Sequence, residues 1–419
     1  MQNKNILEQL NKAKKASVGF GLLPHSKRIL ILKNLAKELR KNKKKIIKAN
    51  LKDLKKISKT NLMRDRLLLN DTRIEGMAKE IESLIKLKDP IGEIFDCRER
   101  LGLKICRRKV PIGVIGIIYE SRPNVTTDVA GICIKSGNAV VLKGGKDGRE
   151  SYIALHKLIK KALLSSGADS EAIQFIDPKI KNAVSDILSA NGLVDLIIPR
   201  GSSGLINFVR ENATIPVIET GAGVCHTYVD DEAKLPQSAR IIFNAKTQRP
   251  SVCNALDTAL INKKIAKEFL PKMAKLLKEK EVEIFADTES FKILKKSYPK
   301  NLLKVAKKSD FGREFLSQKM SVKIVSDIEK AIKFIGKYSS KHSEAILTEN
   351  KNKAVKFLRE VDAAVVYVNA STRFSDGAVF GLGSEIGIST DKIHARGPMG
   401  AREMTTYKWI VSGKYSVRK

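Results

Sequence analysis

The stretch VIGIIY, Val114–Tyr119, decides the fold of the first half of this chain. It is a short uncharged run with the length of a buried strand, and the polar segment Glu120–Asn124 ends it. A helical pattern follows from Thr126 to Lys135, and a second strand is predicted at Ala139–Lys143. Strand–helix–strand alternation of this kind is typical of a parallel sheet with crossover helices.

The alternation continues towards the C-terminus. The next predicted elements are a helix at 151–165, a strand at 173–176, a helix at 180–190, and strands at 193–198 and 216–219. A second series is predicted after residue 253, with strands at 257–261, 281–285, 321–325, 345–348 and 363–368 and helices at 263–279, 327–336 and 350–360. We expect an α/β protein, and its length of 419 residues indicates two or three domains.

Two amphipathic helices and a hairpin precede the first strand. Helical spacing covers Ser26–Ser58 and Asp71–Leu87, and residues 93–110 have the pattern of a β-hairpin. Lys408–Val411 is predicted as a last short strand, free to pair with this hairpin or with its counterpart in another subunit. Because an exposed hairpin offers unpaired edge groups, we expect at least a dimer.

The net charge of +34 raises the question of nucleic-acid binding. The lysines are spread along the chain, and aromatic residues make up only 5% of it, so stacking platforms for single strands are scarce. We predict no nucleic-acid partner and a positive surface that attracts small anionic substrates. A basic RNA-binding protein is the alternative, and an affinity that survives moderate salt would favour it.

Cysteine and histidine usage bears on compartment and metal binding. The five cysteines form no CxxC motif or paired framework, which suits a reducing compartment. The five histidines form no H-E-x-x-H motif or Cys/His cluster, so no metal site is predicted. No signal peptide is visible, and no apolar run approaches the roughly 18 residues of a membrane helix. We therefore expect a cytoplasmic protein without a membrane partner.

Cys253 is the candidate nucleophile. It lies in the polar stretch Asn244–Ala255, and the Asn-Ala-Leu run that begins at Asn254 is expected to open a helix. The helix dipole and the nearby Arg249 would then lower the pKa of the thiol and favour the thiolate.

The other cysteines are weaker candidates for that role. Cys133 lies in an apolar run and is expected in the core, and Cys225 adjoins His226 in a strand, where neighbours point to opposite faces. Cys106 precedes three cations, which makes it the one competitor as a reactive thiol.

Two further features have a functional and a structural interpretation. Gly201–Gly204 follows a predicted strand and precedes a helix, where N–H groups can receive a phosphate, although a plain structural turn has the same pattern. Glu219 ends a predicted apolar strand, where burial would raise its pKa and make it a candidate base. A salt-bridged strand-end carboxylate is the alternative.

A set of segments resembles one known family. They are Val110–Gly116, Tyr119–Thr126, Lys135–Val140, Asp195–Gly201, Ile218–Gly221, the Cys253 loop, Ser340–Ile346, Asn369–Gly377 and Phe380–Thr390. In order and spacing the chain resembles the γ-glutamyl phosphate reductases of the aldehyde dehydrogenase superfamily.

The resemblance implies a domain plan. Residues 1–92 and 111–243 would form a Rossmann-type cofactor-binding domain, to which 367–390 return. Residues 244–366 would form an α/β catalytic domain. Residues 93–110 and 391–419 would form a small β oligomerisation arm.

The implied activity is the NADPH-dependent reduction of L-glutamyl 5-phosphate to L-glutamate 5-semialdehyde and phosphate, the second step of proline biosynthesis from glutamate. The Cys253 thiolate would attack the acyl phosphate to form a thioester. The alternative within the superfamily is an acylating aldehyde dehydrogenase that uses coenzyme A or another acyl phosphate. A glutamate kinase is a further partner that the resemblance leaves open.

The resemblance also implies site residues. Asn124 would donate to the oxyanion, and Glu219 would lie where hydrolytic relatives keep a general base. The positions expected to bind the cofactor NADP(H) are Lys143, Gly201, Ser202 and Glu314. Arg122, Arg249 and His342 are our own hypotheses for contacts with substrate carboxylate or phosphate.

Overall fold

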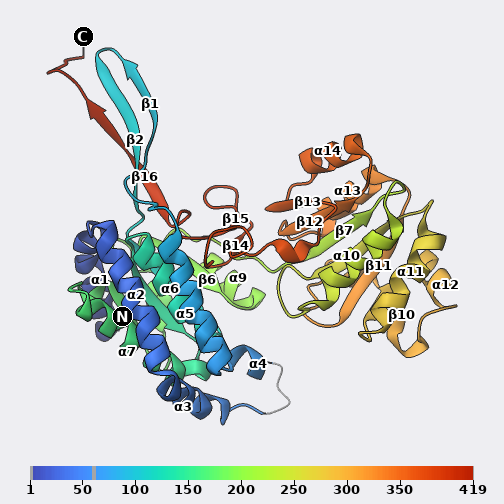
Figure 1. Ribbon diagram of the computed structural model, residues 1–419, viewed down its shortest axis with the longest axis horizontal. Helices are drawn as coiled ribbons and strands as arrows, with labels where there is room; N and C mark the ends of the chain where they lie inside the picture. Colours follow the sequence, from blue (N-terminus) through green and yellow to red (C-terminus); the bar gives the residue numbers. More distant parts are fainter. Residues whose placement is uncertain (1–2, 59–62, 419) are drawn as a thin grey trace. The chain divides into compact units, whose positions relative to one another are not determined.

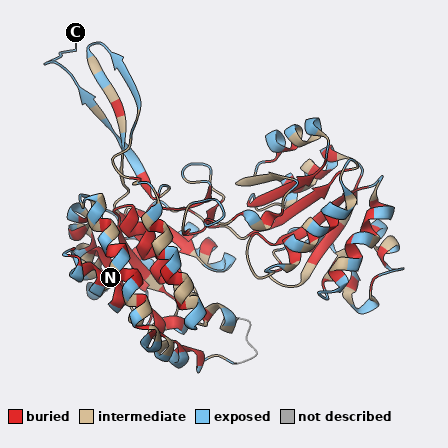
Figure 2. Cartoon of the chain, viewed as in Figure 1, coloured by how far each residue is buried: buried red, intermediate tan, exposed pale blue. Residues whose placement is uncertain are grey.

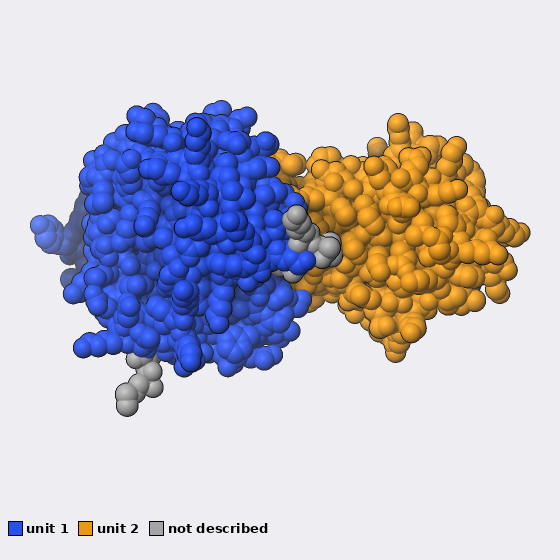
Figure 3. Space-filling view, turned by 90° about the horizontal axis from the view of Figure 1, so that it is seen from below, with its two compact units in different colours: residues 1–220, 381–387, 398–419 blue, residues 221–380, 388–397 orange. Residues whose placement is uncertain are grey.

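The computed structural model describes residues 3–58 and 63–418. They form two compact units, the first of residues 1–220, 381–387 and 398–419, and the second of residues 221–380 and 388–397 (Figure 3). The main boundary therefore lies at 220/221 and not at the expected 243/244, and residues 367–380 stay with the second unit. Strand pairing is the reason, because β7 (Cys225–Val229) pairs with strands of the second sheet.

The first unit is built on a four-stranded parallel sheet with the order β5-β4-β3-β6. The strands are β3 (Val114–Tyr119), β4 (Ala139–Gly144), β5 (Ile173–Phe175) and β6 (Leu196–Arg200). Every residue of β3 is buried, as its uncharged sequence predicts for a central parallel strand. Figure 2 colours the whole chain by burial. The predicted alternation is confirmed here, but the predicted strand at 216–219 is wrong, since only Val217 forms a bridge, to Ile197.

Helices surround this sheet. They are α1 (Lys4–Gly21), α2 (His25–Lys41), α3 (Lys43–Leu54), α4 (Met63–Leu67), α5 (Asp71–Lys86), α6 (Asn124–Lys135), α7 (Arg149–Ser165), α8 (Ala183–Leu188) and α9 (Ser203–Asn212). The single helix predicted from Ser26 is two helices, because the Asn42 side chain binds the carbonyl of Glu38 at 2.8 Å and ends the first. The helix α1 was not predicted.

A three-stranded antiparallel arm projects from the helices of the first unit (Figure 1). Its strands are β1 (Ile94–Arg100), β2 (Leu103–Pro111) and β16 (Thr405–Ser412), in the order β1-β2-β16. The predicted hairpin is confirmed. Of the two pairings left open for the last strand, the structure shows the one within the chain, between β16 and β2.

The cysteines of the arm correct one expectation. Cys97 and Cys106 are joined by a disulfide, although no paired cysteines were expected. Antiparallel neighbours bring facing residues to disulfide distance, and these two Cα atoms lie 4.2 Å apart. Cys106 is therefore not a competing thiol in this structure.

The second unit contains a seven-stranded parallel sheet with the order β10-β9-β11-β8-β7-β12-β13. Its remaining strands are β8 (Leu256–Asn262), β9 (Glu283–Ala286), β10 (Leu303–Val305), β11 (Lys319–Val325), β12 (Ser343–Leu347) and β13 (Val365–Val368). Its helices are α10 (Leu235–Thr247), α11 (Ala266–Lys278), α12 (Thr288–Leu294), α13 (Ile328–Tyr338) and α14 (Lys351–Glu360). A two-stranded pair, β14 (Ile388–Ser389) and β15 (Gly397–Pro398), follows later in the chain.

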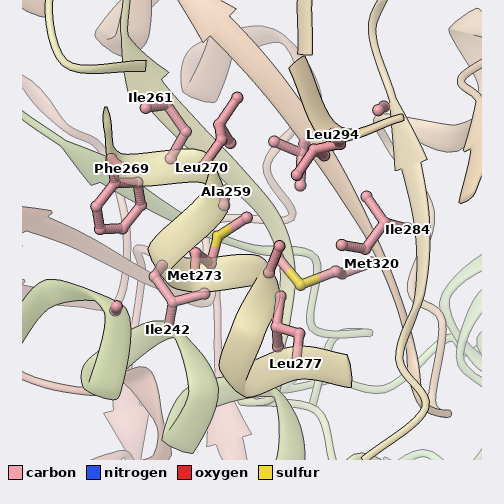
Figure 4. Packing of buried hydrophobic residues seen from close by; sticks show 14 of the residues in the cluster. Ile242, Ala259, Ile261, Phe269, Leu270, Met273, Leu277, Ile284, Leu294 and Met320 are labelled. Atoms are coloured by element: carbon pink, nitrogen blue, oxygen red, sulfur yellow. The ribbon is translucent and has the colours of Figure 1, made fainter. Parts of the chain in front are cut away.

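Alternate residues of the central strands pack on opposite faces of this sheet. Ile261 belongs to a cluster with Ile242 of α10 and Phe269 of α11 (Figure 4). Its neighbour Leu260 belongs to a second cluster with Ile335 of α13. Helices thus cover both faces, which makes this unit a doubly wound α/β structure. In the described part of the chain, no helix is long and apolar enough to cross a membrane.

Candidate active site

Cys253 lies in the loop between α10 and β8, and its side chain is half-buried. The helix expected to open at Asn254 is wrong, because Asn254 and Ala255 lie in a turn. The strand predicted at 257–261 is confirmed as β8, whose seven residues are all buried. The neighbouring helix end is the C-terminus of α10, so the dipole argument for this thiol does not apply.

Hydrogen bonds to a distant loop hold the residue next to the thiol. The Asn254 side chain donates to the carbonyl of Ser375 at 2.7 Å, and the Thr372 hydroxyl donates to the Asn254 carbonyl at 2.8 Å. Asn254 and Thr372 are buried. Buried bonds of this kind fix the backbone on which the nucleophile sits.

The chain packs directly against the backbone of Cys253 on another side. A Cβ atom at Gly223 would lie 1.6 Å from the Cys253 carbonyl oxygen, so only glycine fits there. The buried thiol of Cys225 donates to the same carbonyl at 3.3 Å. Burial, with the charges of Glu344 and Asp257, raises the pKa of Cys225, which keeps that thiol protonated as a donor.

A buried ion pair supports these segments. The ammonium of Lys246 lies 3.9 Å from the carboxylate of Asp257, and both side chains are almost fully buried. Burial raises the pKa of Asp257 to about 7 and lowers the pKa of Lys246 to about 8. Asp257 accepts the N–H of Cys225 at 3.3 Å and that of Phe315 at 2.9 Å.

Two arginines lie near the thiol. Burial and the positive charge of Arg249 lower the pKa of Arg373, and the charge of Cys253 acts in the opposite direction. Arg373 donates to the Gln248 side chain at 2.8 Å and also to the Asn254 side chain. Arg249, which was predicted, and Cys253 therefore both lie within electrostatic reach of Arg373, an arginine for which no role was predicted.

Two further predicted residues lie in the same unit. Glu314 accepts the N–H of Gly223 at 2.9 Å, which places this carboxylate beside the segment that packs on Cys253. His342 is fully buried, with Nδ1 2.9 Å from the Ser343 hydroxyl and 3.9 Å from the Cys225 sulfur. The cofactor contact of Glu314 and the substrate contact of His342 stay predictions.

In the first unit, the predicted cofactor residues gather at one edge of the sheet. Lys143 is next to last in β4, and the Gly201–Ser202 turn directly follows β6. Tyr119 at the end of β3 pairs with Gly144 and with Arg200, so the three carboxyl ends coincide. In open parallel sheets, ligands bind at this edge. Burial and the charge of Lys146 lower the pKa of Lys143.

The turn already binds an anionic group. The backbone N–H of Ser202 donates to the carboxylate of Glu120 at 2.8 Å, and its hydroxyl donates to the same group at 3.2 Å. Ser202 also caps α9, since its oxygen accepts the N–H of Leu205 at 3.4 Å. The predicted anion-receiving geometry is thus present, with a side-chain carboxylate in it.

Asn124 and Arg122 lie on the segment between β3 and α6. Asn124 begins α6, and its amide donates to Asp128 at 2.8 Å. Burial and the charge of Glu80 raise the pKa of Asp128. Arg122 is half-buried at the start of the same segment.

Glu219 is not at the end of a buried strand. Its carboxylate lies 3.7 Å from the guanidinium of Arg210, and its side chain is 23% exposed. The salt-bridge interpretation of Glu219 therefore fits the structure, and its role as a base stays a prediction.

Two other features contain none of the predicted site residues. A basic groove of about 990 Å³ in the first unit is lined by Lys33, Lys37, Arg40, Lys41, Lys79, Glu82, Ser83, Ile85 and Lys86. In the second unit, Asp230, Asp231 and Glu232 bring their carboxylates together, as metal ligands would. Lys353 forms ion pairs with all three, so an ammonium already supplies the positive charge.

Comparison with known proteins sets this geometry in a family. The model of the aldehyde dehydrogenase family matches residues 1–291. The chain belongs to this family. The γ-glutamyl phosphate reductase of Legionella pneumophila (strain Philadelphia 1) is 48% identical over 417 residues, which cover 99% of this chain and 100% of the relative. That of Aquifex aeolicus is 48% identical over 419 residues, covering 99% and 96%.

A solved structure supports the same placement within the aldehyde dehydrogenase family. The crystal structure of γ-glutamyl phosphate reductase from Thermotoga maritima has a TM-score of 0.94 and 44% identity, and covers 99% of this chain and 100% of that one. The predicted fold class and the predicted family are confirmed.

Sequence reasoning missed four residues of these two regions, three around Cys253 in the second unit and one at the turn of the first unit. They are Arg373, Lys246, Asp257 and Glu120. Asp257 carried a usable signal, because it is the one charged residue of the buried strand β8, whereas Lys246 lies in a helix that also contains Arg240 and several polar residues. Arg373 and Glu120 reach their partners only through the fold.

Proposed function

We propose that this chain reduces L-glutamyl 5-phosphate to L-glutamate 5-semialdehyde and phosphate with NADPH, through a thioester on Cys253. The observation that carries the proposal is the half-buried thiol of Cys253, braced by buried hydrogen bonds and accompanied by two arginines. Relatives that match the chain over its whole length bear the name of this activity.

The chemistry follows from the thiol. The thiolate of Cys253 attacks the acyl carbon, the bond from that carbon to the phosphate oxygen breaks, and phosphate leaves with the electron pair. The Asn124 amide is proposed to donate to the oxyanion, an interaction worth about 2.7–4 kcal/mol where it has been measured. After hydride addition to the thioester, the thiohemiacetal releases the aldehyde and the thiol.

NADPH, when bound, supplies the hydride. The Gly201–Ser202 turn fits a phosphate group, because its N–H already donates to a carboxylate and Gly201 keeps the turn free of a side chain. Lys143 at the neighbouring strand end offers a positive charge, and Glu314 is proposed as a contact with the nicotinamide ribose. The preference for NADPH over NADH belongs to this proposal.

The reaction run in reverse tests the proposal. Glutamate semialdehyde and NADP⁺ should give NADPH only when phosphate is present. An unchanged rate without phosphate would show that the acyl group does not pass to phosphate. A third reaction contains coenzyme A in place of phosphate. Turnover only with coenzyme A would establish the acylating aldehyde dehydrogenase as the correct alternative.

We also propose a homo-oligomer. Among the described residues, β16 pairs with β2 on one side only, and its Tyr407 and Trp409 are 45% and 43% exposed. An unpaired, partly apolar edge strand is a template for another chain. Sedimentation velocity should show at least a dimer, and a fully active monomer would contradict this part. A cytoplasmic location is also part of the proposal.

A further inference from the structure

Arg373 has an unusual setting for a guanidinium. It is half-buried, and its guanidinium donates to the oxygens of two neutral side-chain amides, Gln248 and Asn254. Both partners flank the nucleophile loop, since Gln248 precedes Arg249 and Asn254 follows Cys253. Arg373 therefore spans this loop from one end to the other.

The positive charge at this place has little compensation. In the part of the chain that the structure describes, neither Arg249 nor Arg373 forms a salt bridge with a carboxylate. The two guanidinia lie close enough for Arg249 to lower the pKa of Arg373, while the charges of Cys253 and Asp376 act in the opposite direction. Two like charges held together beside one thiol are stabilised by an anion with more than one negative charge.

We propose that Arg373 and Arg249 form the subsite for the phosphoryl group of the acyl phosphate, and for inorganic phosphate in the reverse reaction. This inference rests on the proposed function and names the ligand of one part of its site. The phosphoryl group is the more highly charged end of such a substrate, and it must lie next to the carbon that Cys253 attacks.

The subsite explains how an anionic nucleophile approaches an anionic substrate. A thiolate and a phosphoryl group repel each other, and two guanidinia beside the thiol offset that repulsion. As the carbon–oxygen bond breaks, negative charge grows on the leaving phosphate, and planar guanidinium donors stabilise it. If the arginines instead bound the carboxylate at the other end of the substrate, they would neither offset this repulsion nor stabilise the leaving phosphate.

The first experiment measures the reverse reaction of wild type, Arg373→Gln, Arg373→Lys and Arg249→Gln. The KM for phosphate should rise about 10- to 100-fold in both glutamine variants, because each loses bonds to a charged ligand. The KM for semialdehyde should change less than about twofold. Arg373→Lys should recover part of the loss, since it keeps the charge without the planar fork. The matched control Arg359→Gln removes an arginine that is 78% exposed and should leave every constant unchanged.

A rise in the KM for semialdehyde with an unchanged KM for phosphate would assign the arginines to the substrate carboxylate and overturn the proposal. If wild type shows no phosphate-dependent turnover at all, the proposed function fails. The second experiment then still tests the anion subsite.

That second experiment compares alkylation of Cys253 by iodoacetate and by the neutral iodoacetamide, with peptide mapping. In wild type, iodoacetate should be favoured, and inorganic phosphate should remove this preference. In Arg373→Gln the ratio of the two rates should fall at least about fivefold, as expected for a lost charge contact. A parallel fall of both rates would show that Arg373 only positions the loop, and would overturn the proposal.

Discussion

The Cys253 loop of the second unit and the Gly201–Ser202 turn of the first unit both lie at the end of a regular element, yet they are held differently. Asn254 and Thr372 hold the Cys253 loop through buried hydrogen bonds. Ser202 is exposed and bonds the side chain of Glu120, which can turn away. A nucleophile must keep one geometry, whereas a cofactor must enter and leave.

The largest effect is expected from the thiol itself. Cys253→Ala should reduce turnover about 10⁴-fold or more, as the loss of a covalent nucleophile does elsewhere. Binding of NADP(H), followed by fluorescence titration, should stay within about threefold of wild type, because the turn proposed for the cofactor is unchanged. In wild type, brief alkylation should label Cys253 ahead of the buried Cys133 and Cys225. Inactivation that tracks any other cysteine would move the nucleophile.

The rigidity of the loop is tested at Asn254. Asn254→Ala removes a buried donor and should lower the free energy of unfolding by about 1–3 kcal/mol. Turnover should fall about 10- to 100-fold, since small misplacements of reacting groups are costly. Chemical denaturation and kcat measure the two effects. The control Asn212→Ala removes an exposed side-chain bond to the carbonyl of Phe208 and should change neither by much. A normal kcat in Asn254→Ala would show that the loop needs no brace.

The ion pair beneath the loop should respond to pH. Because the pKa of Asp257 is raised to about 7, the folded state holds a proton that the unfolded state releases near pH 4. The contribution of Asp257 to the free energy of unfolding is present at low pH and is lost as the pH rises to 7. The loss is about 2 kcal/mol between pH 5 and 7. Lys246 has the opposite effect on stability: because its pKa is lowered to about 8, the free energy of unfolding rises with pH above that value. Asp257→Asn should remove the loss between pH 5 and 7, and thermal unfolding over that range checks it. An identical slope in both proteins would exclude Asp257 as its source.

The smallest effect on affinity is expected at the exposed Gly201–Ser202 turn. Glu120→Gln removes a negative charge from the N–H group proposed for the cofactor phosphate. The affinity for NADP(H) should rise about two- to fivefold, in line with the modest energies of exposed charges. Titration at two salt concentrations measures this, and the difference should shrink at the higher one. A weaker affinity would mean that Glu120 helps to position the turn.

How far the sequence predicts this molecule differs between its regions. The uncharged strand β3 and its neighbours are predictable, because burial on both faces leaves a clear pattern. The strand at 257–261 was predicted as well, and the structure has it as β8, but the three residues before it were expected to open a helix, and a run that short carries no period to decide between turn and helix. The end of α2 at Asn42 depends on one side-chain hydrogen bond, which the spacing of apolar residues does not reveal.

The candidate site divides in the same way. Cys253 and Arg249 are close in the chain, so local sequence indicates their proximity. Arg373 contacts the loop from the segment that follows β13, more than a hundred residues later in the chain. Glu120 contacts Ser202 only because β3 and β6 are neighbours in the sheet. Contacts between distant segments depend on topology, which spacing in one sequence does not contain.

The Cys97–Cys106 bridge makes the tip of the arm a covalently closed ring. Leu101, at that tip, is 87% exposed. Arg98 and Lys104 lie on either side of it, and a trypsin-like protease can cleave the chain after such basic residues. A cut inside the ring leaves both pieces attached, so a nicked chain migrates as one band until a reductant is added. The arm can therefore be severed without being lost.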